Sequence, residues 1–438
     1  MSRTKKAFKG LVTSYMSFVV VTAVQLYLSP VLLAKYGQAT LGAYASVIQL
    51  IGYLTLLDAA LSITLNRYIA QAFGKPDKEL VLQKILTISF LIYGFLAVLN
   101  LFLLTGAAFF VAPLFHVEGA LAKDLEIALL IIAVTGLIKT PLSIYGSFLY
   151  AGQHMAYLNI VATALAILRG ALIILFIHLG WGITGIVVGN SISEIALVFV
   201  SYVYHRIKYP GQRPSLNGFD KIMMREVVVF SKDSLIIQLT TKLRMSTDTL
   251  LVGIFISVST ASIFYSSTTP PFMCFTLANL LMINTLPGMN EIIGGGDLVK
   301  IKSIYFKLLK YVLALAACAL IGIILFNRLV VTFWVGKAQY VGNDLNLLVA
   351  MTIALLIIGS FNGNFLIAMG IINQVAKAAL IVAIAGVALS IVLISKYGMA
   401  GLMSSTLAVL IPGNIYSHYQ VARILNLNLL LQPKYITS

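Results

Sequence analysis

Charged residues interrupt several long apolar segments of this sequence, at positions where a membrane-spanning helix would place them in lipid. The stretch TTKLRMSTDTLLVG, residues 240–253, carries Lys242, Arg244 and Asp248 between two apolar runs. A charge at the bilayer centre costs at least ~2.5–3.5 kcal/mol on insertion scales, so such residues usually mark a pathway for ions or substrates. Arginine and lysine at these positions would bind an anion, and a carboxylate would bind a proton or a cation.

The apolar segments hold nine such residues: the basic Lys139, Arg169, Lys232, Lys242 and Arg244, and the acidic Asp58, Glu194, Asp233 and Asp248. One subset lies too far from either end of its segment to reach the interface by extending the side chain: Lys139, Arg169, Glu194, Lys242 and Arg244. Lys232 and Asp58 lie closer to an end, where an interfacial position is a sufficient explanation.

Helical spacing places part of this set on shared faces. At 100° per residue, Asp233, Thr240, Arg244 and Asp248 fall within an arc of about 80°, whereas Lys242 points to the opposite side. Polar stripes of similar spacing occur in the first and fourth apolar segments, and the first includes Gln25. We therefore expect several helices to turn polar faces toward one shared, water-accessible cavity.

The charge balance of this cavity favours an anionic ligand. The nine charges sum to +1, and Arg67, next to Asn66 at the expected cytoplasmic mouth, adds another positive charge. A phosphate or pyrophosphate group would suit such a cavity, because guanidinium and ammonium groups bind it through charge-assisted hydrogen bonds.

The same residues also admit a structural interpretation. Arg244 and Asp248 could form an i,i+4 ion pair that only fixes helix packing. Glu194 could pair with Arg169 or Lys139 and hold two helices together, and Ser/Thr stripes are more often packing contacts than substrate contacts. The spacing alone leaves both interpretations open.

The composition indicates a polytopic membrane protein. Of the 438 residues, 60% are hydrophobic and only 10% are charged, against about 25% charged in soluble domains. Twelve segments are long enough to cross a bilayer as helices, at residues 10–34, 41–64, 85–113, 125–150, 155–179, 183–204, 226–256, 260–286, 305–332, 345–369, 374–395 and 399–421. This predicts an all-α integral membrane protein.

The distribution of Lys and Arg sets the orientation. Twenty of the 30 basic residues lie at one set of helix ends and loops, five lie inside segments, and five lie on the other side: Lys35, Lys123, Arg328, Lys337 and Lys396. By the positive-inside rule both termini lie in the cytoplasm. The net charge of +16 is thus a topology signal, and we expect no nucleic-acid partner.

A basic linker at residues 205–225 divides six segments from six. Short matches between the halves recur at a nearly constant offset, as in WGITG (181–185) and YGMAG (397–401). An even number of spans gives both halves the same orientation, and such parallel repeats enclose a substrate site. We expect an N-terminal six-helix lobe at residues 1–204 and a C-terminal six-helix lobe at residues 226–438.

Enzymatic chemistry is not supported by the sequence. The five histidines form no metal-ligand spacing, and Cys274 and Cys318 predict neither a disulfide framework nor a metal site. The run of glycines at 294–296 is followed by Asp297 and not by the Lys-Ser/Thr of a P-loop. We expect no cofactor, no metal and no catalytic residue.

Three stretches carry a family resemblance. In residues 35–79 the pattern is Gly-x-Tyr, an apolar span, Leu-Asp and then Arg-Tyr-Ile-Ala, formed here by Gly42, Tyr44, Leu57, Asp58 and residues 67–70. TDTLLVG (247–253) and FWVG (333–336) are the other two. All three resemble segments of the bacterial polysaccharide flippases, the Wzx-type O-antigen translocases of the MATE-like superfamily. Ala60 departs from the pattern, because relatives often carry glycine after Leu-Asp.

This resemblance implies two six-helix bundles in a V around a cationic central cavity. The implied substrate is an undecaprenyl-pyrophosphate-linked oligosaccharide, moved from the cytoplasmic to the periplasmic leaflet of the bacterial inner membrane. Alternating access would be coupled to a proton or sodium gradient. Expected partners are membrane lipids, a polysaccharide polymerase and glycosyltransferases, and we expect a monomer.

On this hypothesis the residues have two roles. Substrate binding falls to Arg244, Arg169, Lys139, Arg67, Asn66 and Gln25. Ion coupling falls to Glu194, Asp248, Asp233 and Asp58.

Three other functions stay open at this point. A cation-coupled multidrug exporter of the same superfamily would carry mostly cationic substrates, which suit an acidic cavity. A membrane-embedded polysaccharide polymerase or glycosyltransferase would need a sizeable aqueous loop with catalytic groups. A passive scramblase would have the same cavity without coupling to an ion gradient.

Overall fold

The computed structural model describes residues 3–73, 77–152, 154–215, 219–294, 298–369 and 371–425. Within these ranges it leaves out the side chains of residues 3–11, 54, 233, 237, 241, 244–246, 280, 281, 283–294, 372 and 373. All regular secondary structure in the described ranges is helical. The all-α prediction is confirmed for this part of the chain.

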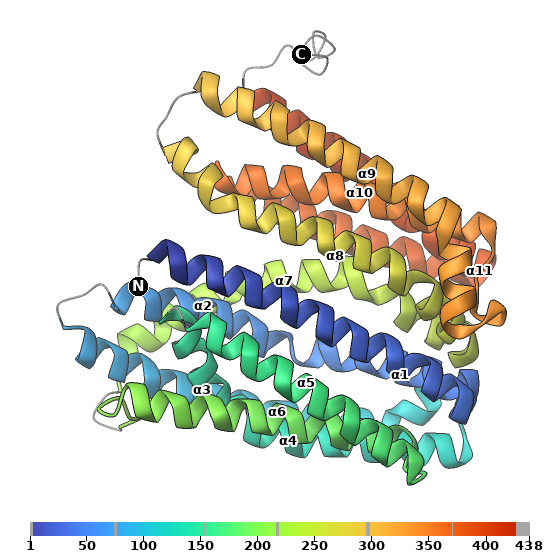
Figure 1. Ribbon diagram of the computed structural model, residues 1–438, viewed down its shortest axis with the longest axis horizontal. Coiled ribbons are helices and arrows are strands. Elements are labelled where there is room, and N and C mark those ends of the chain that lie inside the picture. The colour runs from blue at the N-terminus through green and yellow to red at the C-terminus, as the bar shows by residue number, and fades with distance from the viewer. Residues whose placement is uncertain are drawn as a thin grey trace. The chain divides into compact units, whose positions relative to one another are not determined.

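The chain divides into two compact units, Met1–Leu239 and Thr240–Ser438, and the division falls inside one helix, α7 (Lys221–Phe255). The helices before it are α1 (Arg3–Leu54), α2 (Leu56–Ala72), α3 (Lys78–Phe115), α4 (Gly119–Ala151), α5 (Met155–His178) and α6 (Gly182–Lys208). Those after it are α8 (Val258–Gly294), α9 (Leu298–Val335), the short η2 (Lys337–Gln339), α10 (Asn343–Ala368) and α11 (Ile372–Ile424) (Figure 1).

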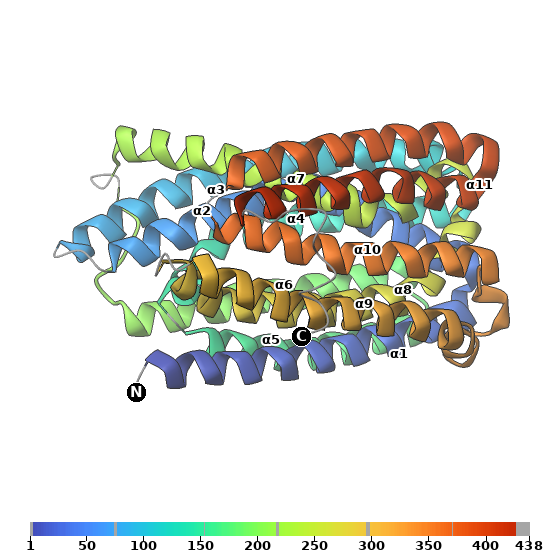
Figure 2. The ribbon, with the colours of Figure 1, turned by 90° about the horizontal axis from the view of Figure 1, so that it is seen from above.

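Two of the helices are each made of two arms joined at a glycine. Gly37 in α1 and Gly398 in α11 have φ of 79° and 58°, a left-handed backbone that glycine adopts without a steric penalty. Each glycine lies between two predicted spans, so both kinks fall where the hydropathy pattern ends one span and begins the next. Figure 2 shows α11 doubling back on itself.

The two arms of α11 pack against each other in a regular antiparallel register. The Ser390 and Ser405 hydroxyls lie 2.5 Å apart. A Cβ added at Gly386 would lie 3.1 Å from Val409. These contacts join residues at equal sequence distance from the turn, as in a helical hairpin. Glycine at such contacts lets helix backbones approach closely, which is typical of packing in membranes.

The second predicted span requires a correction. Residues 41–64 were expected to form one helix, but the helix breaks at Thr55, where φ is −96° and ψ is 9°, and α2 continues to Ala72. The Thr55 hydroxyl bonds to the carbonyl oxygen of Ile51 at 3.1 Å, a local bond that competes with regular helix geometry. Hydropathy did not reveal this break, because both flanking segments are apolar.

Eight helices in the described part of the chain are long and apolar enough to cross a membrane. They include α11, which holds two predicted spans, and α1, which holds the first span and part of the second, together with α3–α6, α9 and α10. Neither α7 nor α8 is among these eight in the described part of the chain. The described structure therefore supports a multi-pass arrangement, and the count of twelve spans stays a prediction.

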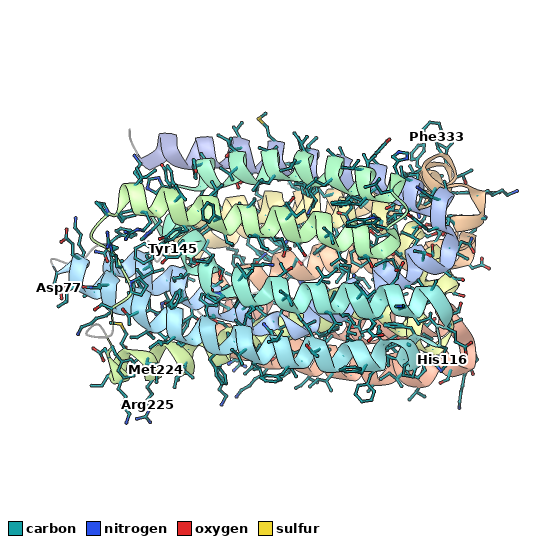
Figure 3. All side chains as sticks on the ribbon, turned by 90° about the horizontal axis from the view of Figure 1, so that it is seen from below. Asp77, His116, Tyr145, Met224, Arg225 and Phe333 are labelled. Carbon is teal, nitrogen blue, oxygen red and sulfur yellow. The ribbon has the colours of Figure 1, made fainter. Side chains whose placement is uncertain are left out.

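The two ends of the N-terminal unit differ in chemistry. Asp77 and His116, just before and just after α3, lie at opposite ends, and Arg225 lies toward the end that holds Asp77 (Figure 3). At the end that holds Asp77 and Arg225, His205 is fully buried, and the centroid of its ring lies 5.0 Å from that of Tyr145 and 4.8 Å from that of Phe148. An aromatic cluster thus anchors the end of α6, from which the linker continues.

The linker between α6 and α7 is attached to α3. The Gln212 amide donates to the carbonyl oxygen of Glu79 at 3.2 Å, and the backbone N–H of Ser215 donates to Thr87 at 3.0 Å. Asp220 then caps α7: its Oδ1 accepts the N–H groups of residues 222 and 223, both at 3.1 Å, and its Oδ2 forms a 3.1 Å ion pair with Lys84. The linker therefore belongs structurally to the N-terminal unit.

Replacement of Asp220 by Asn should loosen this attachment in a pH-dependent way. The Met223 N–H and the Lys84 ammonium hold the pKa of the Asp220 carboxyl below its ordinary value of 3.8. A lowered folded-state pKa stabilises the fold fully above pH 3.8 and loses this contribution as the pH falls through the lower value. Hydrogen exchange at residues 209–224 should be faster in the variant than in wild type near pH 7, and the difference should disappear in strong acid. Asp77→Asn is the control, because Asp77 makes no capping bond; an equal effect there would contradict the interpretation.

Candidate functional site

A buried polar cluster joins three helices of the N-terminal unit around Asp58. The Asn100 amide of α3 donates to both carboxylate oxygens of Asp58, at 3.3 and 3.2 Å. The Thr140 hydroxyl of α4 donates to Oδ2 at 3.4 Å. Asn100 and Thr140 are 2% and 4% exposed, so the carboxylate is held by side chains that have almost no access to solvent. Asp58 thus belongs to a hydrogen-bonded cluster between three helices, which its position along one helix did not predict.

Lys139 and Glu194 form an ion pair between α4 and α6, with 2.8 Å between Nζ and Oε2. This is one of the pairings that the sequence left open. The two side chains are 41% and 48% exposed, although both lie well inside apolar helices. Two charged groups at this depth do not face hydrocarbon, because charged residues in spans face a bundle interior or a water-filled cavity. This surface of the N-terminal unit therefore faces a polar environment.

Arg169 and Gln25 flank a close crossing of α5 and α1. A Cβ added at Gly170 would meet Val24 at 2.9 Å, so glycine is what allows the two helices to approach. Arg169 is half-buried and Gln25 is exposed. No acidic side chain forms an ion pair with Arg169 among the residues that the structure describes.

Asn66 and Arg67 lie near the end of α2. The Arg67 guanidinium sits 4.4 Å from the ring centroid of Phe230, a cation–π contact that holds it against the first half of α7. The Asn66 Oδ1 is buried, and no described group donates a hydrogen bond to it. Arg67 itself is exposed and, like Arg169, pairs with no acidic residue in the described part.

Asp248 lies within the C-terminal unit, beside a small cavity of about 30 Å³. The lining comes from α7 and from both arms of α11, and it includes Ser390 and Thr406 as well as Gly386. The carboxylate, the two hydroxyl groups and the backbone carbonyl at the glycine all offer oxygen atoms that can coordinate a cation. The cavity is of the size that holds one water molecule or one small ion.

Two predicted site residues lie outside the described side chains. Arg244 and Asp233 both fall in α7, whose backbone is helical at these positions. Their predicted shared face with Asp248, and the predicted ion pair between Arg244 and Asp248, stay predictions. Among the described residues, no group of three or more His, Cys, Asp or Glu side chains could hold a metal ion.

The sequence did not identify Asn100 and Thr140 as site residues. Asn100 is a single polar residue in an apolar stretch of α3, and Thr140 lies in the fourth segment beside its predicted polar stripe but not on it. Their role becomes visible only because α2, α3 and α4 bring them to one carboxylate. The arrangement as a whole can bind a cation or proton at a carboxylate, and it presents the guanidinium groups of Arg67 and Arg169 to an anion.

No protein-family model matches the chain, and no curated protein is similar to it in sequence. Solved structures do match it. An inward-facing multidrug resistance MATE transporter of the MOP superfamily superposes with a TM-score of 0.77 over 92% of this chain and 95% of its own, at 13% identity. The chain has the MATE transporter fold.

Two further structures extend this likeness. A MOP superfamily transporter from Pyrococcus furiosus has a TM-score of 0.64, 13% identity and coverage of 94% of this chain and 95% of its own. A MATE transporter of Vibrio cholerae in its bent form has a TM-score of 0.64, 14% identity and coverage of 97% and 98%. The likeness in fold therefore extends over more than nine-tenths of each chain.

The Asp58 cluster predicts strong coupling between Asp58 and Asn100. Asn100→Leu should lower the free energy of unfolding by about 1–3 kcal/mol, because it removes the amide that donates to both oxygens of the Asp58 carboxylate. Asp58→Leu combined with Asn100→Leu should cost less than the sum of the single changes. Chemical unfolding in detergent micelles measures all three variants. Additive effects would show that the two side chains do not interact.

Proposed function

We propose that this protein is a membrane transporter that flips an undecaprenyl-pyrophosphate-linked oligosaccharide across the bacterial inner membrane by alternating access. The main support is the pair of arginines in the N-terminal unit without an acidic partner in the described part of the chain. Arg169 lies inside an apolar helix of spanning length, and Arg67 is held against Phe230. The exposed Arg67 and the half-buried Arg169 are both open to an anionic ligand, which would supply the counter-charge.

The sign of these charges favours a flippase over a multidrug exporter. Cationic drugs would require acidic groups on the exposed surface, whereas the acidic Glu194 is already paired with Lys139. The MOP superfamily structure from Pyrococcus furiosus is described with a reversed polarity of its binding pocket, which suggests a different function for that protein. The MATE fold therefore accommodates pockets of either sign, and the cationic one fits a pyrophosphate.

The oligosaccharide would be contacted by the polar groups near these cations. Asn66 offers a buried amide oxygen without a described donor, and Gln25 is exposed near Arg169. On this proposal Arg244 adds a third guanidinium from α7. The protein would act as a monomer with both termini in the cytoplasm, and it would receive its substrate from glycosyltransferases and deliver it to a polysaccharide polymerase.

The acidic residues supply two routes to ion coupling. Asp248, with Asp233 on the same helix, lies beside a cavity that is large enough for one small ion. In the N-terminal unit, an anion bound to Lys139 would compete with Glu194 for the same ammonium group. Glu194 would then lose its counter-charge, and a proton or a sodium ion would be needed to neutralise it. Asp58, fully hydrogen-bonded, would hold the neighbouring helices in register during this exchange.

Removal of the cations tests the proposed function. In a host strain that lacks this gene, wild type should restore surface polysaccharide, and Arg169→Ala, Arg244→Ala and Lys139→Ala should reduce it. One lost charge-assisted hydrogen bond is worth about 1.5–3 kcal/mol, so binding should weaken by roughly 10- to 100-fold. Gel analysis of the polysaccharide, with membrane amounts of each variant measured in parallel, gives the readout. Full activity of all three variants would rule out the proposal.

A charge exchange provides the matched control for Lys139. The double variant Lys139→Glu with Glu194→Lys keeps the ion pair and moves the positive charge from α4 to α6. If the pair only joins the two helices, the double variant should restore activity. If Lys139 binds the substrate, the double variant should fold and still transport poorly.

Coupling is tested by Asp248→Asn in proteoliposomes. Transport by wild type should rise when a proton or sodium gradient is imposed, and the variant should lose this stimulation while it retains a slow basal rate. The physical reason is that Asn keeps the shape of Asp but does not carry the charge that a proton or cation neutralises. Transport that is independent of any gradient in wild type would instead identify a passive scramblase.

A further inference from the structure

The C-terminal unit contains a second, much larger cavity, with a volume of about 510 Å³. It lies between α10 and the two arms of α11, and none of the predicted site residues lines it. Its volume falls within the roughly 300–1,000 Å³ that ligand pockets in proteins occupy.

Small residues create this cavity. The two arms of α11 are in contact from the turn as far as Val382 and Gly413. A Cβ added at Gly413 would lie 3.2 Å from the Val382 side chain. Beyond that level the cavity lies between the arms and α10, on which Gly363 contributes no side chain. A Cβ added at Gly363 would meet no atom within 4 Å, so the space at this residue is open.

The lining has the character of a site for an amphiphile with an anionic head. Most of its surface is apolar, as at Ala378, Val382 and Leu410. Lys377 is the only charged side chain among the described residues that line it, and Gln374 and Gln420 lie in the same lining within about two turns of the helix ends. The part of the cavity near Lys377 is thus cationic and carries the two glutamine amides, and the rest of the lining is mainly apolar. A cationic drug would meet repulsion at Lys377 and no counter-charge.

We propose that this cavity binds the isoprenoid chain of the substrate's carrier lipid, with the phosphate next to the chain at Lys377. This inference rests on the proposed function, because it takes the lipid-linked substrate from there. The apolar walls would bury the chain through the hydrophobic effect. Lys377 and the two glutamines would donate hydrogen bonds to the phosphate. The end of α11 that carries Lys377 is the one predicted to face the cytoplasm, where such a substrate is assembled.

Photolabelling of the purified full-length protein tests the site. The probe is a polyprenyl phosphate with a photoreactive group in its isoprenoid chain, and mass spectrometry locates the labelled peptides. Labelling of wild type should map to residues 359–382 and 410–420. Gly363→Leu fills the open space, so it should reduce labelling at least about tenfold. Lys377→Ala should weaken labelling, and Lys377→Arg should retain it.

Gly322→Leu is the matched control for the filled cavity. Gly322 is a helical glycine of α9 in the same unit, a Cβ added there also meets no atom within 4 Å, and it does not line the cavity. This variant should label like wild type. The thermal unfolding of both leucine variants is compared, and the smaller Gly363→Ala change, which should reduce labelling partially, is added if Gly363→Leu fails to fold.

Several results would overturn the inference. Equal labelling of Gly363→Leu and Gly322→Leu would do so, and so would labelling that maps outside the two segments. Competition by phosphatidylglycerol as strong as that by unlabelled polyprenyl phosphate would identify a general phospholipid site, and competition by tetraphenylphosphonium would identify a drug site. The failure of this inference is distinct from failure of the proposed function. Wild type that restores polysaccharide in the host strain but does not label the cavity contradicts only this inference, whereas wild type that restores none contradicts the proposed function.

Discussion

The cost of holding charged groups inside apolar helices is the constraint on which the rest of this structure depends. Asp58 shows how the N-terminal unit meets it: α2 carries the carboxylate, α3 delivers an amide and α4 a hydroxyl, at distances of 3.2 to 3.4 Å. Each partner is almost fully buried and comes from a different helix. The packing of α2, α3 and α4 therefore brings together the groups that hydrogen-bond to this carboxylate.

Lys139 and Glu194 meet the constraint in a different way. They neutralise each other at 2.8 Å but keep more than 40% of each side chain exposed. A pair that served only to join two helices would be expected to bury its charges or to lie at a helix end. Exposure of this pair is what the proposed function requires, because it would let an anionic ligand compete with Glu194 for Lys139.

The sequence predicted the helices well because their apolar runs are long and because two glycines mark the turns that join spans at residues 37 and 398. The sequence did not predict the break at Thr55, because apolar residues continue on both sides of it. The break is accompanied only by a local hydrogen bond from the Thr55 hydroxyl to the carbonyl oxygen of Ile51. For Asp58 the sequence allowed an interfacial position as a sufficient explanation, because the depth of a residue was measured along one helix. The hydrogen bonds from Asn100 and Thr140 depend on two other helices, and no spacing within one segment can indicate them.

The same limit explains why the large cavity of the C-terminal unit was not predicted. Gly363, Lys377 and Gln420 come from α10 and from the two arms of α11, and none is unusual in its own helix, yet the hairpin of α11 brings their helices around one space. The N-terminal residues proposed for substrate binding are polar or charged, whereas this lining is mainly apolar, with Lys377 as the charged residue among those described. A lipid-linked sugar has parts of both kinds, and its sugar and its chain differ too much in polarity to share one lining. Two sites of opposite character are therefore what a carrier of such a molecule requires, whereas a carrier of small cations would have no use for the second.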